Sequence, residues 1–287
     1  MTNIEKYNKI NKLKAFVIGS PINHSLSPIL HKYWLNHYNI AGSYKAIEIK
    51  PVNLPVFFKK LQQGEYRGGN ITIPHKTEAL KYCDFVSKEA KTIGAVNTLI
   101  IRDNKIYGSN TDLIGFCKNL DQQAPNWDKN KGAAIVLGAG GAARAILVAL
   151  TKRGFSPIHI LNRSKENAIK LANELKGEYL AHSLNEFENL AANAAIVINT
   201  SSIGMGGTRF DSIDLKKLPK TAIVCDIVYT PLITPLLQDA KDLGLIAVDG
   251  LGMLLHQAAP GFEAWFAVKP EVTSKLRSFI LKTLEAR

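Results

Sequence analysis

Two side chains in separate segments of the chain are of types suited to proton transfer: Lys76 in GGNITIPHK and Asp112 in GSNTD. A glycine-rich turn, GAGGAAR from Gly138, lies downstream of both. The turn is typical of a dinucleotide site. Lys76 can act as a proton donor, and the carboxylate of Asp112 can orient that donor. Together these groups favour hydride transfer to a small polar molecule, so we expect a reductase.

The position of Lys76 shortly after Pro74 predicts that it lies in the first turn of a helix, where proline is favoured. The helix dipole and partial burial would then lower the pKa of the Lys76 ammonium and ease proton exchange near neutral pH. A solvated surface lysine is the alternative. Asp112 also has a purely structural alternative, because a carboxylate in the first turn of a helix is favourable without any catalytic role. If the fold brings it beside Lys76, the carboxylate would hold the ammonium and hydrogen-bond a substrate hydroxyl.

The glycine turn fits the pattern GxGxxA and lies between the apolar run AAIVLG and a helical segment. Small residues let the backbone approach a pyrophosphate, whose charge is met by N–H groups at the helix N-terminus. A tight structural turn is the alternative, but the strand before and the helix after favour binding. The residues expected at the pyrophosphate are Gly138, Ala139, Gly140, Gly141 and Ala142.

The next predicted strand ends in Asn162, Arg163, Ser164 and Lys165. An acidic residue here would favour NAD, because it would bind the free 2′-hydroxyl of the adenosine ribose. A guanidinium instead binds a 2′-phosphate through paired N–H donors. We therefore expect NADP. Basic residues on a solvated helix start are the alternative, above all for Lys165.

Two serines near the N-terminus belong to the segment SLSP. Ser27 precedes Pro28 and is predicted to be a helix N-cap, with proline at the first helical position. No capping role is predicted for Ser25. Two hydroxyls beside free helix N–H groups would suit a ligand that bears a carboxylate.

Short β-rich runs alternate with helical patterns, as in parallel α/β sheets. We expect a doubly wound sheet in each of two domains. The predicted strands are 15–19, 43–49, 69–73, 133–138, 157–162, 194–199 and 222–228, and the predicted helices include 28–38, 141–153 and 165–175.

The polar stretch Asp121–Lys131, which contains Pro125, indicates the domain boundary and puts the dinucleotide domain downstream. From Gly250 onward two amphipathic helices follow, and their apolar faces need a partner, for which the first domain is a candidate. Residues up to about Lys12 are expected to form a frayed extension.

Composition excludes several classes of protein. The 287 residues include 36 Lys and Arg and 24 Asp and Glu, which gives a net charge of +12. The lysines are scattered and no aromatic-basic module accompanies them, so we expect no nucleic-acid partner. The N-terminus lacks a signal-peptide pattern, and the best apolar run, 133–150, is interrupted, so we expect a cytoplasmic protein without a membrane anchor. No disulfide framework or metal site is expected from the spacing of Cys83, Cys117, Cys225, His24, His31 and His75.

Taken in order, the motifs resemble those of the shikimate dehydrogenase family. The resemblance covers nearly all of the chain past about Lys14, and the combination of SLSP, NITIPHK, NTD and MLLHQ is its most specific part. The matching blocks are GSPINHSLSP, GNITIPHK, GAVNT, GSNTD, GAGGAAR, NRS, NTSSIGM, DIVYTP and DGLGMLLHQA.

The resemblance implies reversible, NADPH-dependent reduction of 3-dehydroshikimate to shikimate, on the route to chorismate and the aromatic amino acids. It implies a Rossmann-type NADP domain, 113–249, and an α/β substrate domain with a mainly parallel sheet, 1–112 plus 250–287, with a cleft between them. A monomer or a homodimer fits equally. By the same resemblance, Lys76 and Asp112 would be the catalytic residues. The residues in contact with the substrate would be Ser25, Ser27, Asn70, Thr72, Asn97, Asp112, Tyr229 and Gln257. Those in contact with the cofactor would be Gly138 to Ala142, Asn162 to Lys165, Thr200, Ile227 and Gly250.

Two residues depart from the family's pattern. His75 stands where an apolar aromatic residue is usual, which would affect the pKa of Lys76. Asn167 stands where some members have a second basic residue for the phosphate, a role open to Lys165. Two alternatives remain: a quinate/shikimate dehydrogenase with relaxed use of NAD and NADP, and a relative that senses a metabolite without turning it over.

Overall fold

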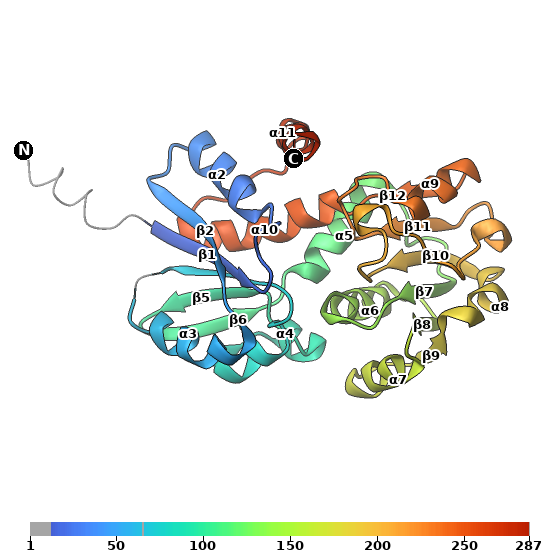
Figure 1. The fold of residues 1–287 in the computed structure, drawn as a ribbon, viewed down its shortest axis with the longest axis horizontal. Helices are drawn as coiled ribbons and strands as arrows, with labels where there is room; N and C mark the ends of the chain where they lie inside the picture. The colour runs from blue at the N-terminus through green and yellow to red at the C-terminus, as the bar shows by residue number, and fades with distance from the viewer. Residues whose placement is uncertain (1–12, 65, 287) are drawn as a thin grey trace, which may run out of the picture. The chain divides into compact units, whose positions relative to one another are not determined.

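The computed structural model describes residues 13–64 and 66–286; the expected N-terminal extension lies outside them. The chain divides into two compact units (Figure 1). Unit 1 comprises Met1–Lys91, Ala95–Thr111 and Ala258–Arg287, and unit 2 comprises Thr92–Gly94 and Asp112–Gln257. The polar stretch Asp121–Lys131 is therefore not a boundary. It lies inside unit 2, because the helix that precedes it already packs within that unit.

Unit 1 is built on a six-stranded, mainly parallel sheet in the order β2-β1-β3-β5-β6-β4. The apolar run after Lys14 forms the buried strand β1, an interior strand that pairs in parallel with a neighbour on each side. The sheet's strands are β1 (Leu13–Gly19), β2 (Gly42–Glu48), β3 (Gly68–Ile71), β4 (Phe85–Val86), β5 (Thr98–Arg102) and β6 (Lys105–Ser109).

The hairpin of β5 and β6, like the short strand β4, was not predicted from the sequence pattern. Strand β5 runs antiparallel to both of its neighbours, β3 and β6. The turn between β5 and β6 is made by Asp103 and Asn104, with φ of 51° and 57°. Asp and Asn tolerate this left-handed conformation, which two-residue hairpin turns require.

Helices cover the unit 1 sheet, and its apolar core contains Phe16, Ile18, Phe58 and Leu99. The C-terminal segment belongs to this unit: α11 contacts α2, and Trp265 Nε1 donates to the Leu99 carbonyl at 2.8 Å. The apolar faces of the last two helices thus find partners in the N-terminal half of the chain. The helical segments are α2 (Ser27–His37), η1 (Pro51–Asn53), α3 (Leu54–Leu61), η2 (Glu78–Tyr82), α4 (Lys88–Ile93), α10 (Leu251–Phe266), which begins in unit 2, and α11 (Ser274–Glu285).

Unit 2 is a parallel, doubly wound sheet in the order β12-β11-β10-β7-β8-β9. The order reverses at β7, the strand that leads into the glycine turn, as in the Rossmann fold. Its strands are β7 (Ala133–Leu137), β8 (Ile158–Asn162), β9 (Tyr179–Ser183), β10 (Ala194–Asn199), β11 (Ile223–Asp226) and β12 (Ile246–Val248).

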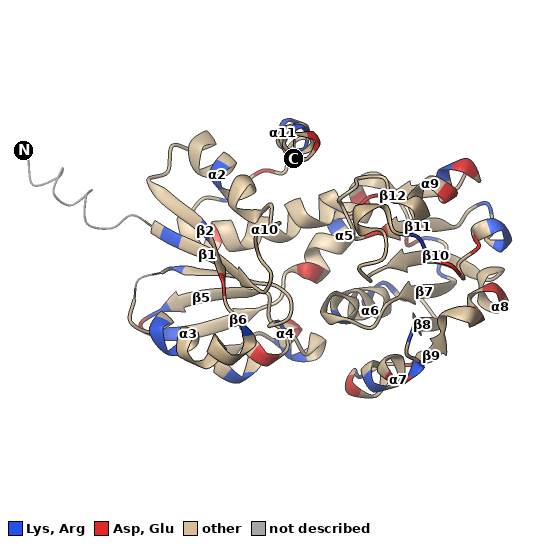
Figure 2. Ribbon diagram, in the orientation of Figure 1, with Lys and Arg blue, Asp and Glu red and all other residues tan. Residues whose placement is uncertain are grey.

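Both helices that were predicted by range in unit 2 are present. Helix α6 has the predicted bounds, and α7 ends one residue before the predicted end. Both signs of charge occur on the exposed face of α7 (Figure 2). The helical segments are α5 (Asp112–Gln123), α6 (Gly141–Arg153), α7 (Lys165–Glu174), η3 (Leu184–Glu186), α8 (Phe187–Ala191), η4 (Met205–Gly207), η5 (Leu215–Lys217) and α9 (Pro235–Asp242).

Residues 13–64 and 66–286 show neither a membrane-spanning helix nor a cluster of metal-ligating side chains. No helix in these ranges has the length and apolar character that crossing a membrane requires. No three or more His, Cys, Asp or Glu side chains gather there in a way that could hold a metal ion.

Candidate active site

Ser25 and Ser27 lie at the start of α2, but neither is its N-cap residue. Helix α2 starts at Ser27, so its N-cap residue is Leu26, which forms no side-chain cap. The Ser25 hydroxyl oxygen instead accepts a hydrogen bond from the Ser27 backbone N–H at 3.3 Å. The predicted N-cap role of Ser27 is wrong, because the helix begins one residue earlier than Pro28 suggested.

The Ser27 hydroxyl is hydrogen-bonded to Tyr44, a buried residue of β2 that the sequence analysis did not single out. Tyr44 Oη donates to Asn70 Oδ1 at 2.6 Å, and Asn70 Nδ2 donates to the Asn97 carbonyl at 3.1 Å. The phenol thus connects two predicted substrate residues, Ser27 and Asn70, and the Asn70 amide extends the connection to a third, Asn97. Since Asn70 Oδ1 can only accept, the phenol proton points toward it and Ser27 donates to the phenol oxygen.

The ring of His31 stacks on Tyr44, with centroids 3.9 Å apart and planes 13° from parallel. Burial lowers the pKa of His31 to about 3, so this imidazole is neutral at physiological pH. Burial also raises the pKa of Tyr44 well above its ordinary value, so the phenol keeps its proton. The connection from Ser27 to Asn70 therefore consists of neutral groups.

Asn97 fixes the segment that leads to Asp112. Its Oδ1 accepts hydrogen bonds from the Thr111 backbone N–H at 2.9 Å and from the Thr98 hydroxyl at 2.8 Å. Asp112 is the first residue of α5 and is only 4% exposed, as the prediction of a carboxylate in a first helical turn requires. Asp112 thus lies where the backbone N–H groups of a first turn have no helical partner.

Lys76 is half-buried in the turn before η2, which is a five-residue 3₁₀ segment. The predicted α-helical first turn, and the macrodipole argument that depends on it, are therefore wrong. The Lys76 carbonyl accepts a hydrogen bond from Val96 N–H at 2.7 Å, which ties this turn to the strand β5 region. Lys76 belongs to unit 1, whereas Asp112 opens unit 2.

His75, which departs from the family's pattern, has a structural role. Its side chain is 1% exposed, and Nε2 lies 2.6 Å from the Ile49 carbonyl, to which it donates. Its backbone N–H donates to the carbonyl of Thr72, a half-buried predicted substrate residue, at 3.0 Å. The histidine replaces an apolar ring in the core and ties the turn between Thr72 and Lys76 to the end of β2.

The glycine turn in unit 2 has the form that a pyrophosphate site needs. Gly138 has φ of +110°, and a Cβ there would lie 2.9 Å from Thr200 Oγ1, so only glycine fits. The Thr200 hydroxyl braces the turn by donating to the Leu137 carbonyl at 2.9 Å. At Gly140, a Cβ would meet no atom within 4 Å, and α6 begins at the next residue. The backbone N–H groups at this helix start are open to an anionic ligand.

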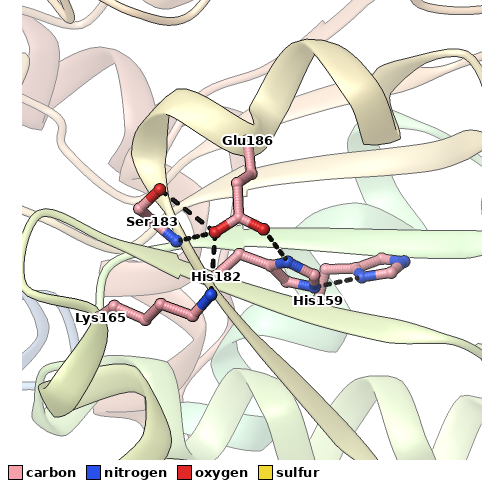
Figure 3. Close-up of polar contacts among 5 residues, drawn as sticks. All are labelled: His159, Lys165, His182, Ser183 and Glu186. Atoms are coloured by element: carbon pink, nitrogen blue, oxygen red, sulfur yellow. Dashed lines mark hydrogen bonds and ion pairs between the residues drawn. The ribbon is translucent and has the colours of Figure 1, made fainter.

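The segment after β8 carries the groups predicted for the adenosine phosphate. Asn162 Nδ2 donates to the Ser164 carbonyl at 2.9 Å, and the Ser164 hydroxyl donates to Glu166 at 2.7 Å. The side chain of Arg163 is exposed. Lys165 is ion-paired with Glu186 at 3.1 Å (Figure 3), a partner that the sequence pattern did not reveal.

The residues expected near the nicotinamide pack tightly against each other. A Cβ at Gly250 would lie 2.4 Å from the Ile227 carbonyl oxygen, so this approach requires glycine. The loop that holds Ile227 and the half-buried Tyr229 is anchored by Asp226, whose carboxylate accepts from Val228 N–H at 2.9 Å and from the Thr234 hydroxyl at 2.7 Å. Burial raises the pKa of Asp226 to about 6.

Gln257, the last predicted substrate residue, lies on α10 where this helix approaches α5. A Cβ at Gly115 would lie 2.7 Å from the Gln257 Cβ and 2.8 Å from the Met253 carbonyl. The Gln257 amide donates to the Leu254 carbonyl at 3.1 Å. The absence of a side chain at Gly115 therefore sets the position of Gln257 relative to α5.

Comparison with known proteins decides the family. The model of the shikimate dehydrogenase substrate binding domain matches residues 17–99, and that of shikimate / quinate 5-dehydrogenase matches residues 120–254. The chain belongs to the shikimate dehydrogenase family. It is 48% identical over 271 residues to a shikimate dehydrogenase (NADP(+)) of Mesorhizobium japonicum, covering 94% of this chain and 96% of the relative.

Solved structures of the family have the same fold. The Thermus thermophilus shikimate 5-dehydrogenase in complex with NADP(H) and shikimate has a TM-score of 0.82 and 33% identity, covering 96% of this chain and 99% of that one. The quinate dehydrogenase of Corynebacterium glutamicum in complex with NAD has a TM-score of 0.86 and 28% identity, covering 94% and 99%. Both substrate variants of the family thus share the architecture of this chain.

Proposed function

We propose that this protein is an NADP-dependent shikimate dehydrogenase that reversibly reduces 3-dehydroshikimate to shikimate. The observation that carries the proposal is the 48% identity, across 94% of the chain, to a relative with that name. The family's reaction supplies shikimate for chorismate and the aromatic amino acids, and it needs no membrane or nucleic acid. We therefore place the enzyme in the cytoplasm with a small molecule as its substrate.

Lys76 is the proton donor in this proposal. When bound, NADPH supplies a hydride to the ring carbonyl carbon, and the Lys76 ammonium gives a proton to the oxygen as it gains charge. In the reverse direction the neutral amine takes the proton from the substrate hydroxyl. Asp112, at the start of α5, accepts a hydrogen bond from a substrate hydroxyl.

Short polar side chains orient the polyol. Ser25, Ser27, Asn70, Thr72 and Asn97 all belong to unit 1, and the hydrogen bonds from Tyr44 and to the Asn97 carbonyl fix the amide of Asn70. Groups held in this way bind a matching hydroxyl strongly and reject an analogue that lacks it, because a buried partner would be left unpaired. Tyr229 and Gln257 contribute further contacts from unit 2.

The residues of unit 2 fit an NADP molecule. The open backbone at Gly140 and the start of α6 suit a pyrophosphate, and the exposed Arg163 suits a 2′-phosphate. Ile227 and Gly250, whose backbones lie in close contact, are the residues proposed to lie near the nicotinamide. No acidic residue follows Asn162 in the position that would bind a free 2′-hydroxyl.

A second candidate is a quinate dehydrogenase that uses NAD. The likeness to the Corynebacterium glutamicum structure, with a TM-score of 0.86, favours it. Arg163 argues against it, because NAD lacks the 2′-phosphate that a guanidinium at this position would bind. A non-catalytic metabolite sensor is a third candidate, opposed by the presence of both Lys76 and Asp112.

One spectrophotometric experiment separates these candidates. The purified chain is assayed at 340 nm with shikimate and quinate, each with NADP and with NAD. We expect kcat/KM to be highest for shikimate with NADP. Higher activity for quinate with NAD would support the second candidate. Binding of shikimate with no reduction of either cofactor would support a sensor.

A further inference from the structure

The carboxylate of Glu186 is the centre of a polar cluster at the carboxyl ends of β8 and β9. Lys165, Ser183 and His182 all point toward it (Figure 3). Glu186 Oε1 lies 3.1 Å from Lys165 Nζ and accepts from the Ser183 backbone N–H at 2.9 Å. Glu186 Oε2 lies 3.0 Å from His182 Nδ1. Lys165, which the sequence made a candidate for the phosphate, is thus bound to an acidic side chain.

The carboxylate is fixed in place and charged. Ser183 and Glu186 form a capping box at the start of η3, in which each side chain bonds the other's backbone N–H. The hydrogen bond from His182, followed by those from the Ser183 backbone and Lys165, lowers the pKa of Glu186 to about 2. His182 is held in turn by His159, whose Nδ1 lies 3.0 Å from His182 Nε2. Lys165 is therefore paired with a carboxylate that the Ser183 backbone N–H and His182 also hold in position.

The charges of Lys165 and Glu186 nearly cancel for any group several ångströms away. Arg163, two residues earlier, is exposed and forms no ion pair within residues 13–64 and 66–286. A 2′-phosphate bound at the start of α7 would consequently be attracted by one uncompensated side-chain cation rather than two. NAD has no phosphate here and is much less sensitive to the charge of Glu186.

We propose that Glu186 is a specificity-determining residue that limits the preference for NADP over NAD by neutralising Lys165. The proposal rests on the proposed function, because it takes the start of α7 to be the site of the adenosine phosphate. Glu186 acts through its position and its charge on Lys165, and it contacts neither the substrate nor the reacting atoms.

The test is the Glu186→Gln variant, which removes the charge but keeps an oxygen that can complete the capping box. Affinities for NADP and NAD are measured by isothermal titration calorimetry, with thermal unfolding to verify the fold. We expect the Kd for NADP to fall roughly three- to tenfold while the Kd for NAD changes less than about twofold. Glu188→Gln is the matched control, since it removes the same charge from an exposed residue paired with Lys217 at 2.5 Å. That variant should leave both affinities unchanged.

A second variant tests whether the effect passes through Lys165. Lys165→Ala should weaken NADP binding less than about threefold in the wild-type background, but roughly tenfold in the Glu186→Gln background. Two results would overturn this proposal: NADP binding by Glu186→Gln that is weaker or unchanged, or equal effects of Lys165→Ala in both backgrounds. The proposed function would still stand if the wild type oxidises shikimate with NADP. A wild type that binds no NADP would overturn the proposed function as well.

Discussion

The replacement of Tyr44 by Phe is a sharp test of how the substrate residues are held. It removes one oxygen atom and leaves the ring stacked on His31. Two buried hydrogen bonds disappear, from Tyr44 to Asn70 and from Ser27 to Tyr44. A buried polar group left unpaired costs about 1–3 kcal/mol. Because Tyr44 is neutral in ordinary assays, at roughly pH 6 to 9, the loss of substrate affinity should not depend on pH in this range.

A penalty of this size that falls on substrate binding corresponds to a rise in the KM for shikimate of roughly tenfold, since 1.4 kcal/mol is a factor of ten. The KM for NADP should change less than about twofold, because the affected groups belong to unit 1. Steady-state kinetics with each substrate varied in turn measure both constants. The control is Tyr33→Phe, which removes a hydroxyl from a half-exposed residue of the same unit. A KM for shikimate that equals the wild-type value would refute the role assigned to Tyr44.

Two other perturbations test unit 2. Because the pKa of Asp226 is raised by burial to about 6, the folded state binds a proton that the unfolded state has released, and stability falls as pH rises from 4 to above 6. Urea unfolding should show this fall to be roughly 3 kcal/mol larger in the wild type than in Asp226→Asn; equal pH slopes would contradict it. Gly115→Ala would put a Cβ 2.7 Å from Gln257 and should cost about 1–3 kcal/mol of stability and raise the KM for shikimate. An alanine variant with unchanged unfolding and KM would show that the two helices separate freely.

Much of the fold followed from local pattern. The apolar runs before Gly138 and Asn162 predicted buried parallel strands, and the helix between them has the predicted bounds. The hairpin around Asp103 and Asn104 was missed because its strands are short and one edge of the sheet reverses direction there. Such a reversal depends on pairing with β3, which residue spacing does not encode.

The site was predicted in its residue types but not in its supporting contacts. Gly138 and Asp112 occupy the local conformations that their motifs indicated. Ser27 and Lys76 do not, because a proline is compatible with several turns and does not fix where a helix begins. Tyr44 gave no signal, because an alternating strand pattern does not distinguish a core phenol from one that holds two site residues.

The most direct test of the central claim is the turnover number of Lys76→Ala with saturating shikimate and NADP. The account predicts that kcat falls roughly 10²- to 10⁴-fold while the KM for shikimate changes only modestly, since proton transfer is lost and most binding contacts remain. Lys81→Ala, at an exposed lysine paired with Glu78 in the same unit, should retain wild-type kcat. A Lys76→Ala enzyme with the wild-type turnover number would contradict the assignment of Lys76 as the proton donor.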